Sequence, residues 1–246
     1  MITSAANPSI KHLQKLLKDR KYRYRQNQFA VEGYRQLEGA RAIEALYVSS
    51  AAEMPELDTK PDRIHIVEHR IFERLADTEN TQGVIAVCPL VHASTPCVDA
   101  RYVLLDALQD PGNAGTIIRT AAAFGYGGVI FTPGCVDPFS PKVVRASMGA
   151  VFQCAIVLIE NFKALRGCRV VAADLGGPDI TAVQLDGPYI LAIGNEARGI
   201  SAGLHPWITQ TVTIPFRTAA INSLNAAVAA GIVMYELSRQ GPKHSQ

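Results

Sequence analysis

Six short apolar segments in the second half of this 246-residue chain constrain its fold more than any other feature. They are rich in β-branched residues, show no alternation of polar and apolar side chains, and occupy residues 102–105, 128–131, 155–158, 170–173, 189–193 and 211–214. Strands of this kind are buried on both faces, as in a parallel sheet covered by helices. Helical patterns occur around them, at residues 114–124, 142–149 and 223–240. The pattern predicts an α/β fold built on a parallel sheet.

The first third of the chain predicts a smaller α/β domain. Asn7 can cap a helix that has Pro8 in its first turn, and apolar residues then recur at helical spacing as far as Leu17. Four apolar segments follow at residues 29–31, 45–48, 64–67 and 83–88, with helices expected at 33–42 and 70–76. The stretch PLVHASTP has two prolines and no periodicity. We therefore expect a linker at about 89–97 between an N-terminal domain, 1–96, and a C-terminal domain, 97–246.

Charge and cysteine usage narrow the class of protein. The net charge of +2 does not by itself indicate a nucleic-acid partner, but residues 11–25 hold seven basic residues and one acid, Asp19. The five cysteines are odd in number and include no C-x-x-C pair, which favours reduced thiols over disulfides or a zinc site. The sequence shows no 18-residue apolar run and no signal peptide. We expect a cytoplasmic protein with no membrane partner and no metal.

The most informative motif is LDALQDPGNAGTIIRTAAAFG at residues 105–125, where a strand ends in a polar loop and enters a helix. Ligands bind at the carboxyl ends of strands in open parallel sheets, and a helix start can hold an anion. Asn113 and Arg119, six residues apart, are the candidates for a shared site. The alternative is that DPGN is a turn with a helix cap and that Arg119 is a solvated helix residue.

Three further segments carry polar residues at comparable places. IGNEARGI at 193–200 sets Glu196 among glycines after a strand, although a surface turn would look similar. IPFRTAAINSLNAA at 214–227 sets Ser223 and Asn225 before an apolar helix, where Ser223 could be a helix cap. KVVRASMGA at 142–150 places Arg145 on a helix, where it could equally be a packed or solvated arginine.

Together these ordered motifs, N-x-G-x-x-x-R-T-A, R-A-S-M-G-A, I-G-N-E-x-x-G and I-P…S-L-N-x-x-V-A, resemble the SpoU (TrmH-type) branch of the SPOUT RNA methyltransferases. The resemblance covers about residues 101–237. The first third resembles the L30e-like substrate-binding domain of ribosomal-RNA members through FAVEGYRQL at 29–37 and TQGVIAV at 81–87. The sequence departs from common family patterns at Asn222, Ala197 and Arg198, which leaves the substrate nucleotide open.

This resemblance implies a trefoil-knotted catalytic domain, one of the rare exceptions to unknotted chains. It implies that S-adenosylmethionine (AdoMet) is the methyl donor, held largely by backbone groups of Gly194, Ile214 and Leu224. It also implies a homodimer whose site is completed across the interface. The catalytic positions carried over are Asn113, Arg119, Glu196, Ser223 and Asn225.

RNA is the partner implied by the resemblance, with ribosomal RNA favoured and transfer RNA as the alternative. The basic stretch within residues 11–25, read as one helix, is the expected contact surface, with Tyr22 and Tyr24 available to stack on bases. The residues expected to bind RNA are Lys18, Lys21, Arg23, Arg25 and Arg145.

The expected reaction is methyl transfer to a ribose 2′-hydroxyl. A guanidinium keeps its proton in nearly every setting, which argues against Arg119 as the proton acceptor. We therefore expect Arg119 to clamp a phosphate and stabilise the developing alkoxide, while the proton passes to a phosphate oxygen or water. Two other classes remain as alternatives: an RNA-binding protein without catalysis, and a nucleotide-dependent oxidoreductase suggested by G-Y-G-G at 125–128.

Overall fold

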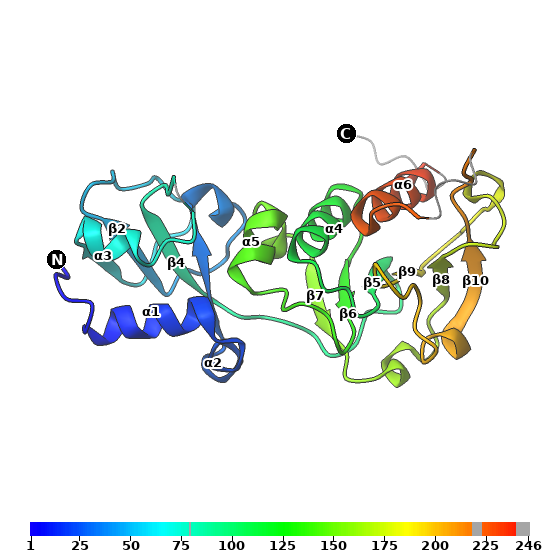
Figure 1. Cartoon of the computed structure of the whole chain (residues 1–246), viewed down its shortest axis with the longest axis horizontal. Helices are drawn as coiled ribbons and strands as arrows, with labels where there is room; N and C mark the ends of the chain where they lie inside the picture. The colour runs from blue at the N-terminus through cyan, green and yellow to red at the C-terminus, as the bar shows by residue number, and fades with distance from the viewer. Residues whose placement is uncertain (79, 218–222, 240–246) are drawn as a thin grey trace. The chain divides into compact units, whose positions relative to one another are not determined.

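The computed structural model describes residues 1–78, 80–217 and 223–239, which form two compact units (Figure 1). The first unit contains residues Met1–Val91 and Asp137–Gln153, and the second contains His92–Val136 and Cys154–Gln246. A stretch from the middle of the chain therefore packs with the N-terminal residues. Among the described residues, no helix is long and apolar enough to cross a membrane.

The first unit is built on a four-stranded sheet. Its strands are β1 (Gln28–Glu32), β2 (Ala45–Ser49), β3 (Ile64–Val67) and β4 (Val84–Pro89), in the order β1-β4-β2-β3. Strand β4 is antiparallel to β1 and β2, and β3 is parallel to β2. The remaining elements are α1 (Pro8–Lys18), α2 (Arg20–Gln26), the 3-10 helix η1 (Tyr34–Leu37), α3 (His69–Glu73), α5 (Pro141–Ser147) and the 3-10 helix η2 (Ala150–Phe152).

Helix α1 begins as predicted, but the basic stretch is not one helix. The Asn7 side chain accepts a hydrogen bond from the backbone N–H of Ser9 at 2.9 Å, and Pro8 occupies the first turn. Asp19 is extended, ends α1, and caps α2 by accepting a hydrogen bond from the Tyr22 backbone. The break at Asp19 therefore divides the basic residues between two helices.

The helix predicted at residues 33–42 is wrong. Only the short η1 is helical there, because Gly33 and Gly39 adopt φ values of 89° and 82°, which an α-helix cannot contain. The helix predicted at 70–76 is confirmed as α3, which starts one residue earlier and ends at Glu73.

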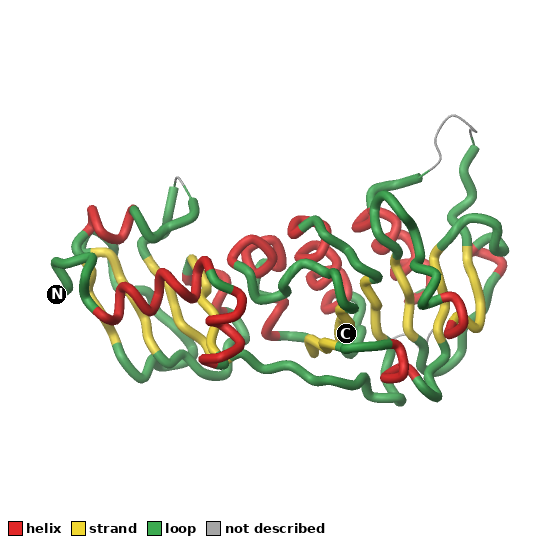
Figure 2. The backbone as a smooth tube through the Cα atoms, turned by 60° about the horizontal axis from the view of Figure 1, so that its bottom comes forward, coloured by secondary structure: helices red, strands yellow, loops and turns green. Residues whose placement is uncertain are grey.

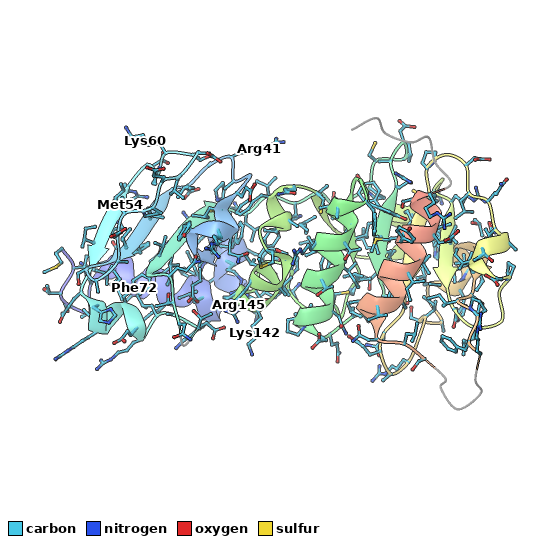
Figure 3. The ribbon with its side chains drawn as sticks, turned by 90° about the horizontal axis from the view of Figure 1, so that it is seen from above. Arg41, Met54, Lys60, Phe72, Lys142 and Arg145 are labelled. Atoms are coloured by element: carbon cyan, nitrogen blue, oxygen red, sulfur yellow. The ribbon has the colours of Figure 1, made fainter. Side chains whose placement is uncertain are left out.

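Residues 137–153 are held in the first unit by a buried ion pair. The Arg23 guanidinium donates to the Asp137 carboxylate from Nη2 at 2.5 Å and from Nε at 2.9 Å, and both side chains are at most 6% exposed. Phe139 packs on Phe29 with ring centroids 5.1 Å apart. Helix α5 carries Lys142 and Arg145 (Figure 3). The Arg145 side chain forms an ion pair with Asp77 at 2.9 Å.

The second unit confirms the predicted parallel sheet. Its strands are β5 (Tyr102–Leu105), β6 (Gly128–Phe131), β7 (Ala155–Leu158), β8 (Val170–Ala173), β9 (Ile190–Ile193) and β10 (Ile208–Val212). They lie side by side in the order β10-β8-β9-β5-β6-β7, and every neighbouring pair is parallel (Figure 2). Strand β10 begins three residues before its predicted position.

Helices and apolar loops cover the two faces of this sheet. Helices α4 (Pro111–Ala123) and α6 (Ala226–Ser238) pack against each other, where Phe124 and Tyr235 have ring centroids 6.0 Å apart (Figure 1). On the other face, Leu104 and Ile130 share a core cluster with Leu165 of the 3-10 helix η3 (Phe162–Leu165). The short 3-10 helices η4 (Ile180–Ala182) and η5 (His205–Trp207) complete the unit.

The loops at the carboxyl ends of β5, β8, β9 and β10 all emerge at one edge of the parallel sheet, because parallel strands share a direction. The G-Y-G-G segment lies instead at the amino end of β6. Its position does not suit the phosphate-binding loop of an oxidoreductase, which follows the carboxyl end of a strand.

Candidate active site

Three side chains from separate segments of the sequence form a hydrogen-bonded chain at this edge. Asn225 Nδ2 donates to Asn113 Oδ1 at 2.9 Å, and Asn113 Nδ2 donates to Glu196 Oε1 at 3.1 Å. Asn113 is 9% exposed and lies in the first turn of α4, Asn225 precedes α6, and Glu196 follows β9. The structure thus brings together three of the five predicted catalytic residues.

The direction of these hydrogen bonds follows from the two outer residues of the set, Asn225 and Glu196. Asn225 Oδ1 accepts from the backbone N–H groups of Ala227 and Val228 as the cap of α6, so its Nδ2 must be the group that faces Asn113. Glu196, as a carboxylate, can only accept. Both amides therefore have one consistent orientation, and the cluster is ordered from a helix cap to an anion.

Glu196 is held as a carboxylate. Burial alone would raise its pKa, but hydrogen bonds from its own backbone, the Asn113 amide and the backbones of Asp110 and Gln109 outweigh burial and lower the pKa. The Asp110 backbone N–H lies 3.3 Å from Glu196 Oε1. The Asp110 side chain in turn caps α4 by accepting from the Asn113 backbone at 2.6 Å.

Two side chains that the sequence interpretation did not select fix the neighbouring loops. Asn195 Nδ2 donates to the Ala107 carbonyl at 2.8 Å, joining the loop after β9 to the loop after β5. Asp106 is 2% exposed and accepts from the Ser201 backbone at 2.6 Å. The sequence signal for Asn195 is the N-x-x-x-G spacing to Gly199, since its Oδ1 accepts from the backbones of Ala197 and Arg198.

We call the hydrogen-bonded set Asn225–Asn113–Glu196 the amide chain. Beside it lies a cavity of about 400 Å³. Its walls come from the ends of β8, β9 and β10 and from the start of α6, and its volume is in the range of about 300–1,000 Å³ found for small-molecule sites. Gly194, Ile214 and Leu224, the three residues expected to hold the methyl donor, all line it, together with Glu196 and Ser223. Apolar wall residues include Ile193, Ile200 and Phe216.

Gly194 is required by close packing at the cavity wall. A Cβ atom there would lie 2.4 Å from the Gly199 carbonyl carbon and 2.7 Å from the backbone nitrogen of Ile200. No side chain fits at those distances, so the loop from 194 to 199 can fold back on itself only with glycine at this position.

Ser223 and Arg119 lie outside the amide chain. Ser223 lines the cavity but does not cap α6, because Asn225 is the cap and the helix starts at Ala226, three residues after the predicted start. Arg119 is exposed on the same face of α4 as Thr116 and Ala123, and it has no hydrogen-bond or ion-pair partner among the described residues. Asn222, a predicted departure from the family pattern, lies outside the described residues, as does Gln240, the predicted end of α6.

The residues expected to bind RNA fall into two groups. Lys18, Lys21 and Arg25 are exposed on α1 and α2. Arg23 is buried against Asp137, Arg145 is paired with Asp77, and Tyr24 donates its hydroxyl to Asp137 at 3.0 Å. Arg23 and Tyr24 therefore hold the first unit together instead of facing solvent.

A parallel sheet with a ligand-sized cavity and an amide–carboxylate chain at the carboxyl ends of its strands defines a class of protein. It is an α/β enzyme that binds a small organic molecule at that edge. The described residues contain no group of three or more His, Cys, Asp and Glu side chains suited to a metal ion.

Sequence comparison identifies the family. Residues 100–235 match the SpoU rRNA Methylase family, and residues 7–86 match the MRM3-like substrate binding domain. The 23S rRNA (guanosine(2553)-2′-O)-methyltransferase RlmP of Bacillus subtilis is 32% identical over 96% of this chain and 98% of its own length. The chain therefore belongs to the SpoU rRNA methylase family, which confirms the resemblance seen in its motifs.

Solved structures agree over nearly the whole chain. The AdoMet-bound rRNA methyltransferase of Sinorhizobium meliloti superposes with a TM-score of 0.83 at 29% identity, covering 98% of each chain. The SpoU methyltransferase AviRb of Streptomyces viridochromogenes, in complex with AdoMet, gives a TM-score of 0.83 at 28% identity over 95% of this chain and 98% of its own. Both the catalytic fold and the preceding substrate-binding unit are thus confirmed.

Proposed function

We propose that this protein transfers the methyl group of AdoMet to a ribose 2′-hydroxyl of ribosomal RNA. The observation that carries the proposal is the Asn225–Asn113–Glu196 chain beside the cavity, because it joins three of the four sequence motifs of the family at one place. The full-length match to RlmP, a 23S rRNA 2′-O-methyltransferase, favours ribosomal over transfer RNA. Such a substrate places the protein in the cytoplasm.

The cavity fits AdoMet by size, by wall composition and by charge. Apolar walls suit the adenine ring, the loop backbone at Gly194 approaches closely, and the carboxylates of Asp174 and Glu196 suit a cationic ligand. Gly194, Ile214 and Leu224 would hold it through backbone groups. When bound, it supplies an electrophilic methyl group on a sulfonium.

The amide chain would orient the acceptor. Asn113 is fixed by Asn225 on one side and Glu196 on the other, so the loop after β5 is rigid where the ribose must be aligned with the methyl group. Ser223, which lines the cavity without capping a helix, offers a hydroxyl to the substrate or the donor.

Arg119 would act on the phosphate next to the reacting ribose. Its guanidinium is free of partners among the described residues and can bind a phosphate through two N–H groups while stabilising the alkoxide. The proton would leave to a phosphate oxygen or water, because a guanidinium is a donor of hydrogen bonds and not an acceptor.

We propose that the protein is a homodimer and that α6 forms part of the interface. Val228, Ile232 and Tyr235 are 51%, 40% and 53% exposed, and their spacing places them on one face of the helix. A second copy seated there would lie beside the exposed face of α4, against which α6 packs and on which Arg119 lies. The site would then be completed across the interface. A trefoil knot in the C-terminal segment is a further prediction that membership of the family implies.

The experiment for the reaction is transfer of a labelled methyl group from AdoMet to ribosomal RNA, followed by mapping of 2′-O-methylated positions with and without the protein. We expect labelling at a defined ribose. Arg119→Lys should lose at least about tenfold in kcat, because an ammonium cannot make the bidentate contact. Near-wild-type activity of Arg119→Lys would contradict the clamp, and labelled bases instead of ribose would contradict the reaction.

We propose that RNA contacts the basic surface of α1 and α2, defined by exposed Lys11, Lys15, Lys18, Arg20, Lys21 and Arg25. The apolar face of α1 is buried in the core, so the lysines lie on its solvent side. Binding should weaken steeply with salt and weaken further when Lys18 and Lys21 are changed to Gln. Lys142→Gln on α5 is a control for the loss of one exposed positive charge elsewhere in the same unit.

A further inference from the structure

The charge of the cavity wall has a marked asymmetry. Of the described residues that line it, Asp174 and Glu196 are charged, and none is Lys, Arg or His. Arg198 and Arg217 follow wall residues in sequence but do not line the cavity themselves. The wall therefore presents two carboxylates to whatever enters, with no basic side chain from the described lining to offset them.

The two carboxylates differ in what they already do. Glu196 accepts from the Asn113 amide and from the Asp110 backbone, so it is committed to the amide chain. Asp174 follows β8, is exposed, and has one side-chain hydrogen bond among the described residues, from the Leu175 backbone to Oδ1 at 2.8 Å. No described cation pairs with Asp174. Its negative charge is available to a ligand.

Methyl transfer changes the charge of the molecule in the cavity. The S–CH₃ bond breaks, sulfur keeps the bonding electron pair, and the new bond joins carbon to the ribose oxygen, whose proton leaves to phosphate or water. The donor thus carries a sulfonium, and the product, S-adenosylhomocysteine, carries a neutral thioether in its place. A carboxylate at the wall distinguishes the two by charge alone.

We propose that Asp174 makes the cavity selective for the positively charged donor over the neutral product, which favours product release after each turnover. The proposal rests on the proposed function of this cavity. Because Asp174 is exposed, its carboxylate would act on the cation through water-like surroundings, where such an attraction is about 1 kcal/mol and changes binding by about five- to tenfold at low salt.

Calorimetric titration of the full-length protein with AdoMet and with S-adenosylhomocysteine tests this inference. We expect Asp174→Asn to weaken AdoMet binding by about five- to tenfold and to change S-adenosylhomocysteine binding by less than about twofold at low salt. The difference between the ligands should shrink as salt is raised to about 1 M. Asp186→Asn removes the same charge from an exposed residue that does not line the cavity, and it should leave both affinities unchanged.

Several results would overturn the proposal while leaving the function intact. If Asp174→Asn weakens both ligands by the same factor, the residue binds a group common to both, such as the ribose diol. If it weakens neither, Asp174 has no role in recognition. Failure of the wild-type protein to bind either ligand would instead contradict the proposed cofactor. A thermal melt of each variant shows whether it is folded.

Discussion

Asp137 is the side chain whose removal should affect the first unit most. Its carboxylate accepts hydrogen bonds from Arg23, from the Tyr24 hydroxyl and from the Phe139 backbone. The Arg23 guanidinium is also tied to the Leu16 carbonyl at 2.7 Å. A charge this deeply buried is stable only while its partner remains, so the pair holds residues 16–24 against residues 137–139.

Asp137→Ala should lower the free energy of unfolding of the first unit by about 3–5 kcal/mol, because it leaves Arg23 charged and buried without its counter-ion. Urea denaturation followed by far-UV circular dichroism measures this effect. Glu73→Ala is the matched control, since it removes one partner of the exposed pair with His69 and should change stability by less than about 1 kcal/mol. Equal losses in the free energy of unfolding for the two substitutions would show that the buried Arg23–Asp137 pair stabilises the protein no more than an exposed pair does.

The lowered pKa of Glu196 makes the stability of the second unit depend on pH. Its pKa is lower in the folded protein than the ordinary 4.5, so the folded state favours the carboxylate. The resulting stabilisation is complete above the ordinary value and is lost as pH falls through the lower, folded value. Glu196→Gln should therefore be less stable than wild type near pH 7 and equal to it in acid.

Trp207, the single tryptophan, lies in the second unit and reports its unfolding by fluorescence. Urea titrations at pH 7 and at about pH 3 give the comparison. Glu236→Gln is the control, because Glu236 pairs with exposed Arg239 and takes no part in the amide chain. A stability difference for Glu196→Gln that stays constant with pH would show that the carboxylate charge contributes nothing.

At the scale of elements, helix α6 has two apolar faces, one buried and one exposed. Its buried face carries Ala230, Val233 and Met234, all at 0% exposure, and packs towards the sheet and α4. Its exposed apolar face has Ile232 at the centre, and in the part of the chain that the structure describes this side chain stays 40% exposed. The helix is therefore apolar nearly all round, which is typical of a helix buried on both sides.

Ile232→Glu should convert the proposed dimer to monomers and abolish methyl transfer while leaving the fold intact. The carboxylate would be buried in an apolar interface at a cost that exceeds the gain from association. Light scattering after size exclusion measures the mass. Val98→Glu, at a position that is 56% exposed outside α6, should leave the mass unchanged. A monomeric wild-type protein with full activity would contradict both the dimer and a shared site.

Comparing predicted with observed helices and strands shows which parts of the structure are determined by the local sequence. Strands β5, β6, β7 and β8 have the predicted bounds, because short β-branched runs bordered by turns leave few alternatives. The helix expected at 33–42 is wrong because two glycines there adopt positive φ, and the spacing of apolar residues does not indicate the φ of a glycine.

The site was predictable to a similar degree. Motif positions selected Asn113, Glu196 and Asn225, which lie in one hydrogen-bonded chain. The burial of Arg23 was not predictable, because its partner Asp137 is 114 residues away and a basic stretch normally stays solvated. Asp174 gave no motif signal either, since only the packing of four loops creates the cavity that it lines.

At the scale of the whole molecule, residues 1–91 alone should be less stable than the same residues with 137–153 attached. The short fragment exposes Phe29 and leaves Arg23 without Asp137, whereas the longer one restores both contacts. With a flexible linker of about ten residues joining the two segments, we expect a melting temperature at least about 10 °C higher. Equal melting temperatures by circular dichroism would show that residues 137–153 are dispensable for the first unit.

The return of residues 137–153 to the N-terminal unit also governs the order of events during synthesis. At about 5–20 residues per second, Asp137 and Phe139 leave the ribosome several seconds after the strands they cover. Throughout that interval Phe29 faces water and Arg23 lacks its counter-ion, so the nascent chain exposes an apolar, incompletely packed surface that is prone to aggregation. A chaperone bound during this window, or a slow codon placed after residue 153, would therefore affect yield without touching the mature protein.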